Sequence, residues 1–207
     1  MRSQTLLLRF GVVLGLLVLG CAAAILYPVV IAKSLISEVQ TIERHPISEV
    51  WLRQWAEEHG GTYLCDDIGC QVEVEVYNSF LSTLRLARPA GFIAVVALEE
   101  GRLARVYMFL SDLNYDARPV GATTSTAIDY TSVREPGSPP SDPEVSEPPR
   151  GKPPSVKYTV TSSAEPHDLV LAYKLNVWCL ARVVRCADSE QAPEIWALRR
   201  PDGYYER

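Results

Sequence analysis

The chain has 207 residues, a formal net charge of −5 and 47% hydrophobic residues. This length is enough to bury the core of one ordinary domain. The acidic balance argues against nucleic acid as a partner, because binding phosphate groups requires a stripe of Lys and Arg side chains that this sequence lacks.

The first predicted element is a membrane span. No charged residue occurs in the 23 positions from Phe10 to Ala32, which as a helix would measure about 35 Å against a hydrocarbon core of about 30 Å. A cleavable signal has a shorter apolar core, about 7–15 residues. A lipoprotein acylated at Cys21 would expose the apolar residues that follow to water. We therefore expect residues 10–32 to be a single span that contacts the lipid bilayer, with cleavage and lipidation as the alternatives.

The flanks of this span set its expected orientation. Residues 1–9 would form a short cytoplasmic tail, although the basic residues on the two sides give only a slight bias. Four cysteines in two close pairs follow the span, and paired cysteines favour an oxidising compartment. We therefore expect the C-terminal domain to lie outside the cytoplasm. The chain contains no N-x-S/T sequon, which agrees with a bacterial envelope protein.

Residues 33–59 are predicted to form a helical stalk and an amphipathic helix. Four apolar residues recur with helical spacing in the stalk, namely Leu35, Ile36, Val39 and Ile42. Pro46 interrupts this pattern and can begin a second helix. Gly60 and Gly61 would end that helix. Its core-facing side is expected to carry Ile47, Val50, Trp51 and Trp55.

From Thr62 the apolar period changes from 3.6 to 2, which predicts antiparallel strands. "CQVEVEVY" alternates as a half-exposed strand does, and "FIAVVAL" is apolar on both faces. With "FLSTLRLA" and "LARVYMFL", these segments predict a meander of about five strands between Thr62 and Leu110. The Thr-rich "ATTSTAIDYTSV" would add another strand.

Residues 134–155 are the least foldable part of the sequence, because eight of these 22 residues are proline. We expect a disordered loop there, inserted into one extracytoplasmic β-rich domain at 60–207. A boundary between two small domains is the alternative. Strand character resumes in "VKYTVTS", "LVLAYKLNVW" and "EIWAL". The predicted fold class is α+β, with an N-terminal transmembrane helix and short stalk before a mainly antiparallel sheet.

The cysteines predict two structural disulfides. Cys65 and Cys70 flank a four-residue turn, and closing so small a ring contributes roughly 2 kcal/mol. Cys179 and Cys186 are too far apart on a straight helix to bond, so their pairing requires a loop or hairpin. Cross-pairing between the two pairs stays open. A redox or zinc role would favour tighter cysteine spacing.

The sequence contains no metal-binding histidine pair, nucleophile elbow, phosphate-binding loop or dinucleotide fingerprint. We therefore expect no catalytic, cofactor-binding or metal-ligating residues and no cofactor. The function predicted is a membrane-anchored extracytoplasmic binding or assembly module with a protein partner in the cell envelope. The alternatives are a hydrolase-like envelope enzyme using His167 and Asp168, and a pilin-like structural subunit that packs through its N-terminal helix.

Overall fold

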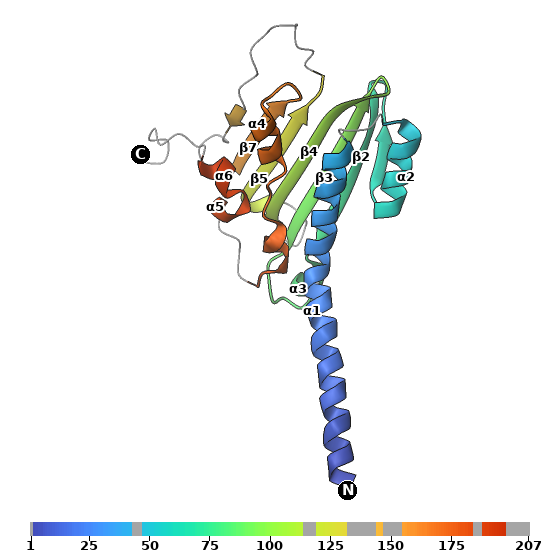
Figure 1. Cartoon of the computed structure of the whole chain (residues 1–207), viewed down its shortest axis with the longest axis vertical. Coiled ribbons are helices and arrows are strands. Elements are labelled where there is room, and N and C mark those ends of the chain that lie inside the picture. Colours follow the sequence, from blue (N-terminus) through green and yellow to red (C-terminus); the bar gives the residue numbers. More distant parts are fainter. Residues whose placement is uncertain are drawn as a thin grey trace.

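The computed structural model describes residues 2–42, 47–113, 119–131, 144–146, 155–183 and 188–197. These residues form an α+β fold in which a long N-terminal helix and several short helices accompany one mainly antiparallel sheet (Figure 1). The fold class predicted from the sequence is confirmed.

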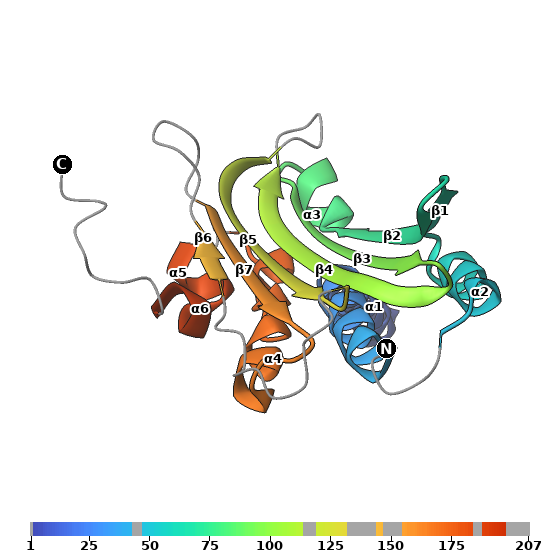
Figure 2. The ribbon, with the colours of Figure 1, turned by 90° about the horizontal axis from the view of Figure 1, so that it is seen from above.

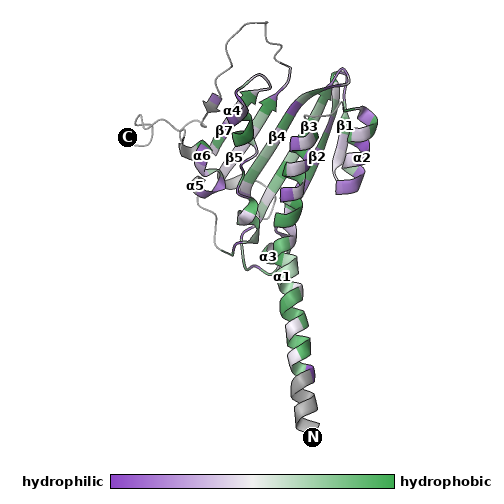
Figure 3. Ribbon diagram, in the orientation of Figure 1, coloured by the Kyte–Doolittle hydropathy of each residue, from purple (hydrophilic) through white to green (hydrophobic). Residues whose placement is uncertain are grey.

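Helix α1 (Arg2–Ile42) joins the predicted span and stalk into one continuous helix of 41 residues. From residue 10 to residue 23 it projects from the domain and is apolar over most of its surface (Figure 3). Its C-terminal half packs on the sheet through residues spaced three or four apart: Val29, Ala32, Leu35, Val39 and Ile42. Among the described residues, α1 is the one helix whose length and composition would allow it to cross a membrane.

Helix α2 (Glu49–His59) follows in the predicted region, but its buried face differs from the prediction. Ser48 caps its N-terminus by accepting a hydrogen bond from the Trp51 amide at 3.2 Å, and Gly60 ends it in the left-handed conformation. Val50 is 77% exposed and Trp51 is 37% exposed. The residues buried in α2 are Leu52, Trp55 and Ala56, because this is the face that turns toward β1 and β2.

The sheet has seven strands in the described residues, in the order β1-β2-β3-β4-β5-β7-β6. The strands are β1 (Thr62–Cys65), β2 (Gly69–Tyr77), β3 (Ala90–Glu99), β4 (Arg102–Leu113), β5 (Pro119–Asp129), β6 (Glu144–Ser146) and β7 (Ser155–Thr161). All neighbours pair antiparallel except β5 and β7, which are parallel. A parallel pair requires a long connection, and the proline-rich segment lies in that connection. Strand β6 lies within the loop predicted at 134–155, whose other residues before Ser155 are outside the described ranges.

Three predicted strands are helical in the structure. "FLSTLRLA" overlaps α3 (Ser79–Thr83), so four strands rather than five lie between Thr62 and Leu110. "LVLAYKLNVW" contributes to α4 (Pro166–Ala172) and to the 3₁₀ helix η1 (Val177–Ala181). "EIWAL" overlaps α6 (Pro193–Ala197), which follows α5 (Asp188–Gln191). Pro166 and Pro193 stand at the first position of their helices, where proline is favoured, and short apolar runs do not distinguish helix from strand.

Helices α1, α2 and α4 lie on one side of the sheet, as the view along α1 shows (Figure 2). The core lies between these helices and the alternate residues of the central strands, such as Val74, Phe92 and Met108. On the other face, Glu75 of β2 is exposed and Val95 of β3 is half-buried. The sheet therefore runs from the base of the domain, near α3, to the opposite end, where β2 begins.

Candidate functional site

The turn between β1 and β2 is the most distinctive surface feature of the domain. Its strands pair so that Cys65 lies opposite Cys70 and Gly69 lies opposite Glu99. The turn therefore lies beside the β3–β4 hairpin, at the end of the sheet far from the N-terminus (Figure 1). We call residues 65–70 the distal turn.

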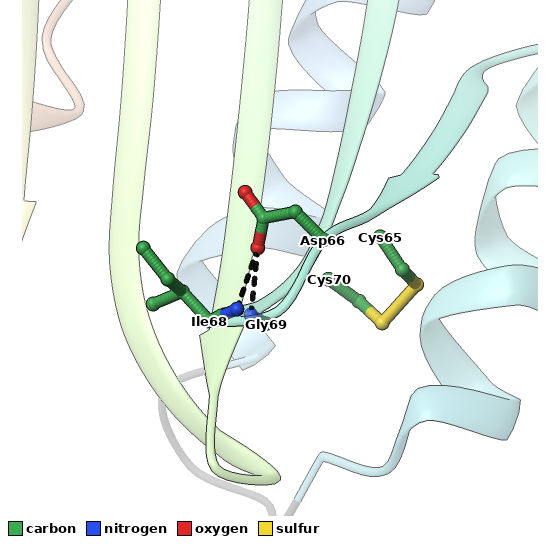
Figure 4. The surroundings of a disulfide bond; sticks show 5 residues. All are labelled: Cys65, Asp66, Ile68, Gly69 and Cys70. Carbon is green, nitrogen blue, oxygen red and sulfur yellow. Dashed lines mark hydrogen bonds between the residues drawn. A yellow bond between two sulfur atoms is a disulfide. The ribbon is translucent and has the colours of Figure 1, made fainter.

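A disulfide joins Cys65 to Cys70 across the distal turn, with a Cα–Cα distance of 4.1 Å (Figure 4). This is the nearest-neighbour pairing that the sequence predicts. Cys179 of η1 is also disulfide-bonded, while Cys186, its predicted partner, lies outside the described residues. Cys21 is an exposed free cysteine on the projecting half of α1.

The Asp66 side chain fixes the backbone of the turn from inside. Its Oδ1 accepts hydrogen bonds from the amides of Ile68 and Gly69, each at 2.9 Å (Figure 4). The Asp66 amide in turn donates to the Gly69 carbonyl at 2.9 Å. The amides of Gly69 and Ile68 stabilise the carboxylate and hold the pKa of Asp66 below its ordinary value. The turn is thus constrained by both the disulfide and these hydrogen bonds.

Gly69 allows the turn to lie against β3. A Cβ atom at this position would stand 2.0 Å from the carbonyl oxygen of Leu98, well inside van der Waals contact. Only glycine permits this approach, and the sequence signal for it is an aspartate followed three positions later by glycine.

The apolar side chain of Ile68 extends from this turn into solvent, with 70% of its surface exposed. It borders two open hollows, of about 330 Å³ toward Gln71 and Leu98 and about 450 Å³ toward Leu103 and Tyr130. The charged residues that line the hollows are Asp66, Asp67, Glu99, Glu100 and Arg102. The distal turn therefore carries an apolar side chain among mainly acidic side chains. This arrangement suits the binding of a partner better than catalysis.

A second polar cluster joins α1 to α2. Glu38 Oε2 accepts from Trp55 Nε1 at 3.0 Å and lies 2.7 Å from His59 Nε2, while Ser34 Oγ donates to Glu38 Oε1 at 2.9 Å. Burial tends to raise the pKa of Glu38, but the Trp55 and Ser34 hydrogen bonds and the nearby His59 outweigh it and hold the pKa below its ordinary value. Both carboxylate oxygens are engaged, so this cluster fastens the helices together.

The structure places both residues of the predicted hydrolase alternative in α4. His167 is exposed in the first turn of α4, and Asp168 is its immediate neighbour. Consecutive helical residues do not face each other. The Asp168 main-chain carbonyl accepts a hydrogen bond from the Tyr158 hydroxyl at 3.2 Å, which ties α4 to β7. No group of three metal-ligating side chains occurs within the described residues.

Comparison with known proteins found no matching family model and no significant match among the curated proteins or the solved structures.

Proposed function

We propose that the protein is a membrane-anchored binding or assembly module that presents its distal turn to a protein partner in the cell envelope. The anchor is the apolar projecting half of α1, and the folded domain lies outside the cytoplasm. In this proposal the protein acts by binding rather than by catalysis.

The observation that carries this proposal is the exposure of Ile68 on a constrained turn. Folding normally buries an isoleucine, which contributes about 1.5–3 kcal/mol, yet here the fold holds this side chain in water. The disulfide and the Asp66 hydrogen bonds order the turn before any partner arrives. A preordered turn loses little conformational entropy on association, so the exposed area can contribute directly to affinity.

The chemistry around Ile68 defines the partner that would fit. Four carboxylates and one cation line the hollows beside the apolar side chain, namely Asp66, Asp67, Glu99, Glu100 and Arg102. A complementary surface would offer an apolar pocket with a basic rim, since opposite charges steer association and disfavour wrong partners.

The test is photocrosslinking in cells that express the full-length chain. A photoreactive amino acid at position 68 is expected to give one discrete, saturable product, while the same residue at Glu57 on the exposed side of α2 gives none. A photoreactive residue at position 67 would then report on binding-site variants. Its product is expected to disappear with Ile68→Asp and to persist with Ile68→Val. A product that survives Ile68→Asp would contradict the role of the distal turn.

The location is tested separately with a membrane-impermeant thiol reagent. In a Cys21→Ala background, Glu57→Cys is expected to react in intact cells, because the domain lies outside the cytoplasm. Reaction only after cell lysis would place the domain inside. The position of the full-length chain in the pellet after a carbonate wash tests the anchor itself.

A second candidate, a structural subunit that assembles through α1, is favoured by the large apolar residues exposed on the projecting helix, among them Phe10, Leu14 and Leu17. Native electrophoresis of the detergent-solubilised chain distinguishes the two, because assembly through α1 would produce a ladder of sizes. The binding module would migrate as one small species.

A further inference from the structure

We propose that the base of the domain docks on the headgroup surface of the same bilayer that holds α1, with a preference for anionic lipid. This inference rests on the proposed anchor. We define the basal surface as Leu84, Arg85, Leu86 and Arg88, which follow α3, together with Trp178 of η1.

The first argument is the position of the domain along α1. A hydrocarbon core of about 30 Å takes about 20 helical residues. Counted from Phe10, where the charge-free segment begins, such a core ends near Val29. Ile25 is already half-buried, and Pro28 and Val29 are buried against the domain. No spacer separates the bilayer from the domain, so the lowest part of the domain lies at headgroup depth.

The second argument concerns which elements occupy that level. α1 contacts both α3 and η1, and α3 lies at the end of the sheet toward the projecting half of α1 (Figure 1). Lys33 Nζ is 4.5 Å from the centroid of the Trp178 ring. Lys33 is only about 6 Å further along the helix axis than Val29. Trp178 therefore lies at the depth where tryptophan is enriched in membrane proteins.

The third argument is the chemistry of the basal surface. Leu84 is 53% exposed, Leu86 is 52% exposed and Trp178 is 48% exposed. Arg85 and Arg88 are also exposed, and the sequence has no acidic residue from Asn78 to Leu98. Apolar side chains among cations match the acyl–headgroup boundary, where the arginines reach lipid phosphates.

The fourth argument is the backbone of Arg85, which has a φ of +56°. The Leu86 amide donates to the Leu81 carbonyl at 3.0 Å, a bond typical of the left-handed turn that ends many helices. Glycine suits this position best. An arginine at this position points to a use for its side chain, because the backbone gains nothing from it.

The experiment uses the full-length chain reconstituted into bilayers. In the Cys21→Ala background, a single cysteine replaces Leu84, Leu17 or Ile68 and carries an environment-sensitive fluorophore. The background without an added cysteine must show no label. The quenchers are lipids that carry a nitroxide either near the headgroup or deep in the acyl chain. The bilayers are phosphatidylcholine with an increasing fraction of phosphatidylglycerol.

The label at position 84 is expected to be quenched by the headgroup nitroxide, increasingly as the anionic fraction rises, whereas the label at position 68 is not. Arg85→Gly should lower the ratio of docked to undocked protein about fivefold in anionic bilayers, the factor equivalent to about 1 kcal/mol for one basic residue at the surface. Arg85→Lys should preserve docking. Arg102→Gln, the same charge change in the β3–β4 hairpin, should have no effect.

Three results would overturn the proposal in distinguishable ways. Quenching at position 17 by the deep nitroxide without quenching at position 84 would leave the anchor intact and refute the docking. Absence of quenching at position 17 would refute the anchor and the docking together. Quenching at position 84 that is unchanged by anionic lipid and by Arg85→Gly would overturn the lipid preference. A thermal unfolding experiment shows that the Arg85→Gly variant is folded. Its unfolding temperature is expected to equal or exceed that of the parent.

Discussion

At the scale of single residues, two neighbours in the distal turn have opposite roles. Gly69 matters because it has no side chain, and Ile68 matters because its side chain is held in solvent. Both positions follow from the close approach of the turn to β3, where Gly69 lies opposite Glu99.

We predict that Gly69→Ala lowers the free energy of unfolding by at least about 3 kcal/mol, a large effect for one methyl group. Its Cβ would meet the Leu98 carbonyl oxygen at 2.0 Å, and backbone cannot move aside cheaply. Thermal and denaturant unfolding of the full-length chain in detergent measure the change. The matched control is Gly101→Ala, where a Cβ meets nothing but φ is +74°, so the expected loss is about 1 kcal/mol. Equal losses at the two positions would contradict the steric argument.

Asp66 should make the distal turn sensitive to acid. Its pKa is lowered in the folded state, so its contribution is complete above the ordinary aspartate pKa and is lost as the pH falls through the lowered value. We predict faster amide hydrogen exchange at Ile68 and Gly69, relative to the intrinsic rate, below that pH. Asp66→Asn should keep an acceptor and remove the pH dependence, and Asp66→Ala should expose both amides at every pH. Asp67→Ala removes the adjacent carboxylate and is the control. Its amide exchange should depend on pH as that of the parent does.

At the scale of elements, the contact between α1 and α2 depends on one carboxylate. Glu38 satisfies the indole of Trp55, which is only 3% exposed, and also contacts His59. The sequence does not reveal this contact, because Trp55 is 17 positions and His59 is 21 positions from Glu38.

Replacing Glu38 with alanine should lower the free energy of unfolding by about 1–3 kcal/mol, because a buried donor would lose its acceptor. Since the pKa of Glu38 is lowered in the folded state, the part of this contribution that depends on the charge of the carboxylate should be present at neutral pH and be lost as the pH falls through the lowered value. Unfolding of the parent and the variant across this pH range measures both effects. Glu57→Ala, on the exposed side of α2, is the control, and a loss there equal to that at Glu38 would contradict the role of the cluster.

The accuracy of the sequence predictions varied with the element. β2 and β7 were predicted correctly because residues alternate along them between the core and the other face. α3, α4 and α6 were predicted as strands, since five to seven apolar-rich residues fit either period. α4 is tied to β7 by the hydrogen bond from the Tyr158 hydroxyl to the main-chain carbonyl of Asp168, a contact that no local pattern reveals.

At the scale of the whole molecule, α1 is both the proposed anchor and a core helix. We predict that a chain lacking residues 2–23 is soluble and folded, because the residues that pack on the sheet begin further along. Deletion through Ile42 should unfold the domain, since Val29, Leu35, Val39 and Ile42 together contribute about 6–12 kcal/mol at about 1.5–3 kcal/mol each, comparable to the stability of a whole domain. Circular dichroism and protease resistance of the two truncated chains measure this. A folded product of the longer deletion would show that α1 is dispensable.

The sequence by itself determined the features that depend on local order. These are the charge-free segment from Phe10 to Ala32, the alternation of β2, and the Cys65–Cys70 pair across a short turn. The tertiary structure alone decided that β5 and β7 run parallel, and that Ile68 is exposed while Leu52 is buried. These outcomes depend on contacts between distant residues, whose free energy outweighs the small local preferences of short segments and leaves no periodic signal along the chain.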